Sequence, residues 1–200
     1  MRKATSVVRK LKVFPIAVRR SKRYVPGSRR HAHQSRLACR SKHSSACFQR
    51  AEAIGLKSAA EAADEAARQS QFRQIKIKAD ADHHIDTIAA IRTARPDADL
   101  IVDANQSWSF ELLRSIAPEL KRLGVSVIEQ PLPAKEDASL EGYECPVLLM
   151  ADESCQDCAD LPAAACRYGA INIKLDKTGG LTEALRLQRA AARLGLRTMV

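Results

Sequence analysis

The amino-acid sequence predicts an α/β fold with parallel strands, on two observations. From about residue 51 onward, short apolar runs rich in β-branched residues alternate with helical stretches, which is typical of successive strand–helix units. Polar residues follow these runs at the same place in each unit. Both a doubly wound sheet and a closed barrel satisfy this pattern. After a first run at 54–56, the next six begin every 22 to 25 residues, at Ile75, Leu100, Val125, Val147, Ile171 and Leu196.

The first predicted helix covers residues 59–72, an alanine-rich stretch. Ser58 stands just before it and Glu61 follows three residues later, the spacing of a capping box. In that arrangement the hydroxyl and the carboxylate each satisfy one main-chain N–H that the helix leaves without a partner.

Two further helices are expected nearer the carboxyl end. One covers 183–194, where Thr182 precedes the helical stretch and Gly195 follows it as a stop signal. The other covers 110–123, where Pro118 must lie near a kink or at a helix start because proline has no main-chain N–H.

The positive charge of the chain belongs to its first 50 residues. The formal net charge is +10, but residues 1–50 hold 15 of the 33 Lys and Arg and none of the 23 Asp and Glu. The chain is therefore predicted as a basic, poorly structured extension at 1–50 and a mildly acidic domain at 51–200, whose 46% hydrophobic content overall allows one sizeable core.

A nucleic-acid-binding tail on a non-catalytic remnant is the alternative from another functional class. The tail offers few aromatic side chains for stacking on bases, only Phe14, Tyr24 and Phe48, and no known nucleic-acid motif. Nucleic acid is therefore not the expected partner. No apolar run approaches the roughly 18 residues of a membrane helix and no secretory h-region is present, so a cytoplasmic protein without a membrane partner is expected.

Six cysteines occur in the chain, and the Cys155-x-x-Cys158 pair is spaced like half of a zinc site. A structural zinc site needs a second close pair of ligands, whereas Cys145 and Cys166 stand alone. The cysteines are therefore interpreted as reduced thiols that pack in the fold.

Five charged residues follow the second to the sixth predicted strands, at successive gaps of 25, 26, 23 and 22 residues. In a barrel, the carboxyl ends of all parallel strands open onto one face, so that these side chains would converge there. A single such residue is more often a helix cap or a solvated side chain, but five in register favour a functional site. They are Lys78, Asp103, Glu129, Asp152 and Lys174.

The chemistry of such a cluster points to proton transfer assisted by a metal ion. Three converging carboxylates repel one another unless a cation neutralises them, and oxygen ligands of this kind favour Mg²⁺. A cation nearby also lowers the pKa of a lysine, which can then act as a base near neutral pH. The metal would stabilise the enediolate that forms when a proton leaves the carbon beside a carboxylate, and one lysine on each face would then give racemisation or epimerisation.

The motifs around these residues resemble the barrel motifs of the muconate-lactonizing branch of the enolase superfamily. Within that branch, residues 172–185 are most similar to the L-Ala-D/L-Glu dipeptide epimerases. The resemblance implies an isomerase with an incomplete TIM-type (β/α) barrel of about seven parallel strands, covering roughly residues 51–200. The motifs are Ile75-Lys-Ile-Lys78, Val102-Asp-Ala-Asn105, Ile128-Glu-Gln-Pro131, Ala151-Asp-Glu-Ser-Cys155 and Ile171-Asn-Ile-Lys-Leu-Asp-Lys-Thr-Gly-Gly180.

Carried over position by position, the resemblance implies a role for nine residues. Asp103, Glu129 and Asp152 would bind Mg²⁺. Lys78 and Lys174 would be the two acid/base catalysts that act on a small dipeptide substrate. The supporting or substrate-binding residues would be Lys76, Asn105, Glu153 and Lys177. Trp108 is expected to pack in its loop rather than to bind a ligand, and a homo-oligomer is left open.

The sequence departs from this family at both ends. Members have an amino-terminal capping domain of more than a hundred residues, where this chain offers 1–50 with only a scrap of similarity at Val13-Phe-Pro-Ile-Ala17, so a shifted reading frame is one hypothesis. The chain stops at Met199-Val200, before the Asp-x-Asp motif of the family's last strand. The expectation is a fragment with exposed sheet edges and poor independent stability, either active or a dead remnant.

Several relatives in the same branch share the lysines and the metal site. They are the N-succinylamino acid racemases, the o-succinylbenzoate synthases and the cycloisomerases. Only the motif after the sixth strand favours a dipeptide substrate over theirs.

Overall fold

The computed structural model describes residues 51–82 and 84–200. The predicted basic extension and its nucleic-acid-binding alternative lie outside these residues. The described chain forms one parallel sheet whose seven strands lie side by side in the order of the sequence. The strands are β1 (Ala51–Ile54), β2 (Gln74–Lys78), β3 (Asp99–Asp103), β4 (Val125–Glu129), β5 (Leu148–Ala151), β6 (Ala170–Asn172) and β7 (Arg197–Met199).

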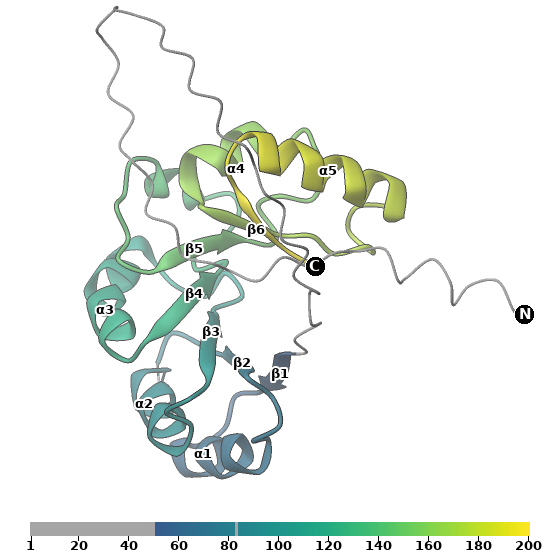
Figure 1. Ribbon diagram of the computed structural model, residues 1–200. Helices are drawn as coiled ribbons and strands as arrows, with labels where there is room; N and C mark the ends of the chain where they lie inside the picture. Colours follow the sequence, from purple (N-terminus) through teal and green to yellow (C-terminus); the bar gives the residue numbers. More distant parts are fainter. Residues whose placement is uncertain (1–50, 83) are drawn as a thin grey trace, which may run out of the picture. The chain divides into compact units, whose positions relative to one another are not determined.

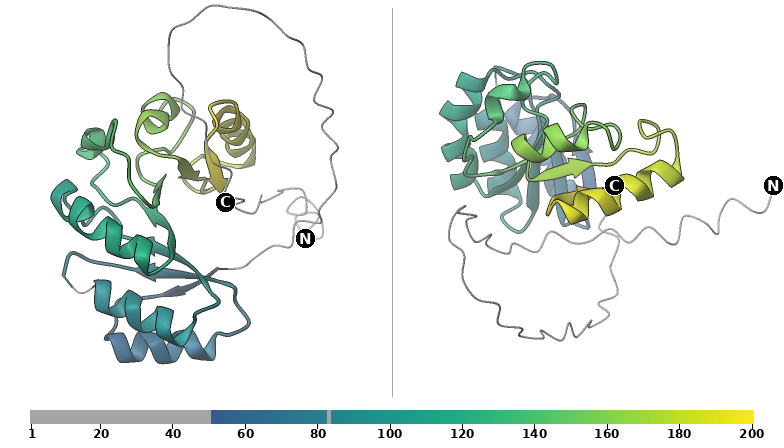
Figure 2. Two further views of the ribbon diagram at one scale, coloured as in Figure 1. Left: turned by 60° about the vertical axis from the view of Figure 1, so that its left-hand side comes forward. Right: turned by 90° about the horizontal axis from the view of Figure 1, so that it is seen from above.

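Helices connect the strands and lie on one face of the curved sheet, as Figures 1 and 2 show. Helices α1 and α2 contact each other, as do α4 and α5. None of the helices in the described residues is long and apolar enough to cross a membrane. The helices are α1 (Ala59–Arg68), α2 (His84–Ala94), α3 (Phe110–Arg122), α4 (Leu161–Arg167) and α5 (Leu181–Arg193), with a short 3₁₀ helix η2 (Asp137–Leu140) after β4.

The strand order decides between the two predicted architectures. A doubly wound sheet reverses its strand order at a switch point, whereas these strands follow one another from β1 to β7 without reversal. A sheet of sequential parallel strands with helices on its outer face is a (β/α) half-barrel. The predicted incomplete TIM-type barrel of about seven strands is therefore confirmed for the described residues.

The core lies between the sheet and its helices, and it fixes the strand register. The central strands read as nearly continuous apolar runs, as in β3, where Leu100, Ile101 and Val102 are fully buried. In this register Lys78 pairs with Asp103 across β2 and β3, and Asp103 pairs with Glu129 across β3 and β4. Packing of the core therefore brings the charged strand ends to one level.

Some predicted boundaries were wrong. The first strand ends at Ile54, which pairs with Ile77, and Leu56 beyond it is 65% exposed, so the apolar run at 54–56 is not the strand. Helix α1 stops at Arg68 rather than at residue 72. Buried Arg95 donates hydrogen bonds to main-chain carbonyls of the turn that follows the helix.

The signals for helix ends had mixed outcomes. The capping box of Ser58 and Glu61 is confirmed, since each side chain meets the main-chain N–H of the other residue. Gly195 follows α5 with a φ of 78°, a left-handed value that suits a glycine stop. Gly180, and not Thr182, stands at the start of α5. Pro118 lies inside α3 and not at a helix start, so the Arg114 carbonyl has no N–H to accept from at that position.

Candidate active site

Seven polar side chains gather at the carboxyl end of the sheet, each placed there by its strand. Lys76 and Lys78 are two residues apart on β2 and so point to the same face. Asp103 and Glu129 end β3 and β4, and Asp152 directly follows β5. Asn172 ends β6, with Lys174 two residues beyond it.

Lys76 lies between two carboxylates on neighbouring strands. Its Nζ is 2.8 Å from Oδ2 of Asp103 and 2.8 Å from Oε2 of Glu129, and both carboxylate side chains are fully buried. Lys78 Nζ also contacts Oδ2 of Asp103 at 2.8 Å, from a side chain that is 38% exposed. Two negative charges that would be costly to bury alone are thus neutralised at close range.

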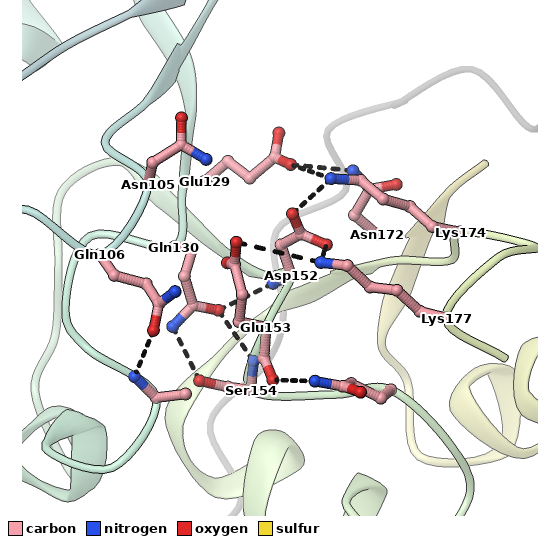
Figure 3. A network of polar contacts seen from close by, with 12 residues as sticks. Asn105, Gln106, Glu129, Gln130, Asp152, Glu153, Ser154, Asn172, Lys174 and Lys177 are labelled. Carbon is pink, nitrogen blue, oxygen red and sulfur yellow. Dashed lines mark hydrogen bonds and ion pairs between the residues drawn. The ribbon is translucent and has the colours of Figure 1, made fainter.

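A second group of ion pairs surrounds Asp152, whose side chain is 1% exposed. Lys174 Nζ lies 2.5 Å from Oδ2 and Lys177 Nζ 2.7 Å from Oδ1, so each carboxylate oxygen has its own ammonium (Figure 3). Lys174 Nζ also lies 4.0 Å from Oε1 of Glu129. Lys174 therefore joins this group to the Lys76 group through Glu129.

The pKa values of the site reflect these pairs. Burial alone lowers the pKa of Lys76, but the charges and hydrogen bonds of Glu129 and Asp103 outweigh it and raise the pKa above its usual value. The pKa of Lys174 is also raised, since the hydrogen bond and charge of Asp152 overcome the effect of burial. For Asp103, burial raises the pKa, yet Lys76 and Lys78 together hold it below its usual value.

The expected supporting residues lie in the same place. Asn105 accepts a hydrogen bond from Lys78 and donates its main-chain N–H to Oδ1 of Asp103 at 3.1 Å, from a left-handed backbone with φ of 45°. Oε1 of Glu153 lies 3.9 Å from Lys177, while its Oε2 is buried without a hydrogen-bond partner. All nine predicted site residues are therefore brought to the carboxyl end of the sheet.

Two residues of this region were not predicted. Asn172 donates from Nδ2 to Oε1 of Glu129 at 2.8 Å, and Gln130 donates and accepts within a buried network beside Asp152 (Figure 3). The available signal was an amide one or two residues from a charged residue, within the Glu-Gln-Pro and Asn-x-Lys motifs. An amide at the end of a strand that is otherwise apolar needs hydrogen-bond partners once buried.

Trp108 packs as expected, with 1% exposure and its indole N–H donated to the Asp80 carbonyl at 2.8 Å. The cysteines within the described residues are free thiols. Burial, reinforced by the charges of Asp160 and Asp157, raises the pKa of Cys155 to about 12, so this thiol stays protonated at neutral pH. Cys155 therefore packs in the fold, whereas Cys166 is exposed.

The carboxylates fit a divalent cation in charge and in atom type. Asp103, Glu129 and Asp152 present only oxygen donors, as Mg²⁺ prefers, from three adjacent strands. Oε2 of Glu129 is buried and faces the Lys76 ammonium, whose Nζ lies 2.8 Å away. Within the described part of the chain, no three acidic, His or Cys side chains stand close enough together to hold a metal ion as they are. Lysine ammonium groups lie between these carboxylates instead.

The chain is similar in sequence to curated epimerases and racemases. It is 48% identical over 132 residues to an L-Ala-D/L-Glu epimerase of Escherichia coli, which covers 66% of this chain and 41% of that protein. It is 46% identical over 126 residues to an N-acetyl-D-glutamate racemase of Pseudoalteromonas, which covers 63% of this chain and 40% of that protein. The chain thus spans about two-fifths of the length of these curated relatives.

The solved structures that match this chain also include dipeptide epimerases and their homologues. A structure of an L-Ala-D/L-Glu epimerase matches with a TM-score of 0.71 at 45% identity, over 74% of this chain and 47% of that one. An enolase family member from Agrobacterium tumefaciens with homology to dipeptide epimerases matches with a TM-score of 0.70 at 42% identity. The match covers 75% of this chain and 46% of that one. The family model for the enolase C-terminal domain-like proteins matches residues 58–200, and the chain belongs to that family.

Proposed function

We propose that the strand-end cluster is the catalytic centre of an epimerase that moves a proton at the carbon next to a carboxylate, with L-Ala-D/L-Glu or a similar dipeptide as substrate. One observation carries this proposal: a row of three buried carboxylates has Lys78 at one end and Lys174 at the other. The L-Ala-D/L-Glu epimerase and N-acetyl-D-glutamate racemase relatives support it, since both names describe a change of configuration at one carbon.

Asp103, Glu129 and Asp152 are the residues that would hold Mg²⁺. Their oxygen atoms fit the ion, and a dipeptide epimerase from Cytophaga hutchinsonii, similar in structure at 26% identity, was solved in complex with Mg and the dipeptide D-Ala-L-Val. When bound, Mg²⁺ supplies positive charge that neutralises the carboxylates and polarises a substrate carboxylate. Asn172 would keep Glu129 in place through the hydrogen bond to Oε1.

The two lysines would carry the proton. Lys78 ends β2 and Lys174 follows β6, so they approach the carboxylate row from opposite sides. A neutral lysine on one side takes the α-proton, and an ammonium on the other side returns a proton to the opposite face, which inverts the carbon. The carboxylates raise the pKa of Lys174, whereas positive charge bound to the same carboxylates would lower it towards neutrality. Lys76 would hold positive charge between the carboxylates and face the substrate carboxylate.

The test uses the complete chain with Mg²⁺ in D₂O. We expect NMR to show loss of the glutamate α-proton signal from both L-Ala-L-Glu and L-Ala-D-Glu. Because each lysine serves one face, Lys78→Ala and Lys174→Ala should each stop epimerisation but keep proton exchange with one of the two epimers. Lys121→Ala, a change of an exposed lysine on α3, is the matched control and should behave like the wild type.

N-acetyl-D-glutamate in a parallel sample separates the dipeptide reaction from that of the racemase relative. Faster exchange with the acetyl compound than with the dipeptides would identify an N-acetylamino acid as the substrate instead of a dipeptide. The proposed proton transfer would still hold. Wild-type exchange no faster than in the Lys78→Ala/Lys174→Ala double variant would refute activity in this chain.

A further inference from the structure

Gln130 is a buried amide in an unusual backbone conformation. It directly follows Glu129 at the end of β4, its side chain is fully buried, and its φ is 37°. A residue other than glycine in this left-handed region costs about 1–3 kcal/mol, and it persists only where surrounding contacts determine it. The contacts of the side-chain amide therefore indicate why this conformation is kept.

Every polar atom of the Gln130 amide is used. Its Oε1 accepts from the main-chain N–H of Asp152 at 2.9 Å and of Ser154 at 3.1 Å. Its Nε2 contacts the Leu132 carbonyl at 2.8 Å, Oγ of Ser154 at 2.7 Å and the Tyr168 hydroxyl at 3.1 Å. Figure 3 shows the amide beside Asp152 and Ser154, the residues on either side of Glu153.

The orientation of this amide is fixed from outside the site. The Tyr168 hydroxyl donates to Oδ2 of Asp137 at 2.8 Å, so its oxygen is left to accept from Gln130. Asp137 is 1% exposed, and its Oδ1 forms an ion pair of 2.8 Å with Arg167 at the end of α4. Turning the Gln130 amide over would place its oxygen against the Leu132 carbonyl, with no hydrogen to share.

We propose that Gln130 is a positioning residue for Asp152: its amide, oriented by Tyr168 and Asp137, holds the main chain at 152–154 so that the Asp152 carboxylate faces Lys174 and the proposed metal site. This inference rests on the proposed function where it concerns the metal. The main-chain part stands by itself, since two N–H groups on one carboxamide oxygen restrain the turn that carries Asp152.

Asp152 gains its direction from this turn. No helix or strand continues past residue 151 to hold the aspartate, because β5 ends at Ala151 and α4 begins only at Leu161. Partners behind a metal ligand fix its orientation, and their loss typically weakens metal binding by about 10- to 100-fold. Gln130 would supply that restraint for a ligand just after the next strand, so that the end of β4 provides both Glu129 and the support for Asp152.

The test measures Mn²⁺ binding by the electron paramagnetic resonance signal of free Mn²⁺, using the complete chain. Gln130→Met keeps the length of the side chain and removes all five contacts, and we expect Mn²⁺ to bind about 10- to 100-fold more weakly. Tyr168→Phe removes only the hydroxyl and should weaken binding by about threefold. Gln106→Met is the matched control, because that glutamine accepts from Ala134 N–H in a neighbouring loop and does not contact Asp152, so the affinity should stay within about twofold of wild type.

Amide hydrogen exchange, followed by NMR, gives a readout that needs no metal. In both variants the Asp152 and Ser154 N–H groups should exchange faster, by about tenfold in Gln130→Met, while Val102 in β3 keeps its rate. A purely structural Gln130 would instead speed exchange throughout the sheet and leave the Mn²⁺ affinity of the folded protein unchanged.

The outcomes separate this inference from the proposed function. Unchanged exchange at Asp152 and Ser154 in the variants overturns the positioning role, whether or not Mn²⁺ binds. Wild-type Mn²⁺ affinity in Gln130→Met overturns the link to the metal site alone. Absence of Mn²⁺ binding in the wild type overturns the proposed metal site, and the exchange rates then decide the main-chain role. If Gln130→Met does not fold, Tyr168→Phe decides the same questions with the smaller expected changes.

Discussion

The two ends of the half-barrel both hold cationic side chains that are partly or fully buried, but they pair them with different partners. At the carboxyl end of the strands, lysines meet carboxylates in the candidate active site. At the opposite end, Arg92 and Arg95 donate to main-chain carbonyls of the loops that lead from helices into strands. A carboxylate carries a negative charge and can exchange a lysine for a proton or a metal cation, whereas a main-chain carbonyl is neutral and does not titrate near neutral pH.

Arg95 shows how completely the opposite end uses a cation for structure. The residue is 4% exposed and follows α2, and its guanidinium reaches back to the carbonyls of Ala66, Gln69 and Phe72 at distances of 3.2, 2.8 and 2.6 Å. Asp97 accepts from two guanidinium nitrogens, Nε at 2.9 Å and Nη2 at 3.0 Å. The turn after α1 is thereby fixed to the turn after α2.

Arg92 connects the loop after α2 to the loop after α3 in the same way. It donates to the carbonyls of Leu123 at 2.8 Å and Gly124 at 3.2 Å, and to Ala98 at 2.8 Å. Gly124 has a φ of 74°, and an added Cβ there would lie 3.3 Å from the guanidinium. The two arginines therefore join three successive loops. They hold this end of the half-barrel together, whereas the ion pairs at the carboxyl end of the strands could be replaced by pairs with a metal ion or a proton.

The largest effect that would test this contrast is the loss of one carboxylate at the strand ends. Glu129→Gln keeps the shape and the hydrogen bond from Asn172 but removes the charge that faces Lys76 and Lys174. We expect α-proton exchange to fall about a thousandfold, because metal-ion stabilisation is worth several kcal/mol, and Mg²⁺ to stop raising the melting temperature. NMR exchange and thermal melts with and without Mg²⁺ measure both effects.

The control for that variant is Glu119→Gln, which changes a surface glutamate of α3 that pairs with Arg122. It should retain exchange and the response to Mg²⁺. An equal loss in both variants would mean that negative charge in general, and not this carboxylate, is required.

The second largest effect should come from the opposite end. Arg95→Ala leaves buried carbonyls without donors, and we expect the free energy of unfolding to fall by about 2–3 kcal/mol while exchange per folded molecule stays at the wild-type rate. Urea titration measures the stability, and the NMR assay below the unfolding transition measures the activity.

Arg122→Ala is the matched arginine control, since its pair with Glu119 lies on the surface and should contribute little to stability. Equal losses of stability in Arg95→Ala and Arg122→Ala, or a collapse of activity in stable Arg95→Ala, would show that the two ends are not separated as described.

The contrast also explains what the sequence could predict. Lys78, Asp103, Glu129, Asp152 and Lys174 repeat at the strand period, because the proposed chemistry would select the type of each side chain. Arg92 and Arg95 left no comparable signal, since their partners are main-chain carbonyls that any residue provides. The parallel strands and their helices could be predicted for the same reason as the site. Both predictions rest on the pattern of side-chain types along the sequence.

Gln130 and Asn172 show the limit within the site itself. Both stand in motifs that were singled out, yet their roles depend on which main-chain N–H or carboxylate lies opposite after folding. Lys76 is a similar case, expected to support Lys78 and found between Asp103 and Glu129. Spacing along the chain places a residue at the strand end, but only the register across strands decides its neighbours.

A smaller effect should appear in the dependence of stability on pH. Because the pKa of Asp103 is lowered in the folded protein, its ion pairs stabilise the fold above the usual value of 3.8 and are lost as the pH falls through the folded value. The pKa of Lys76 is raised, so its contribution is present below 10.5 and is lost as the pH rises through the folded value. The Arg95 contacts with carbonyls do not titrate in either range.

Urea unfolding at about pH 7 and about pH 3 can measure the acid side of this prediction. The wild type should lose stability on acidification, whereas Asp103→Asn should lose less. If Asp103→Asn loses as much as the wild type, other carboxylates govern the acid transition and the lowered pKa of Asp103 has no measurable share.

The smallest predicted effect tests whether position at the carboxyl end of the strands is by itself enough to affect proton exchange. Ser109 caps α3 at that end of the sheet by accepting from Leu112 N–H at 3.1 Å, without contacting a lysine or carboxylate of the site. Ser109→Ala should lower the free energy of unfolding by about 1 kcal/mol and leave proton exchange unchanged, as measured by urea titration and NMR. Ser109→Asp, which can cap equally well, should restore the stability. Reduced exchange in stable Ser109→Ala would mean that the helix start, and not only the strand end, sets the geometry of the site.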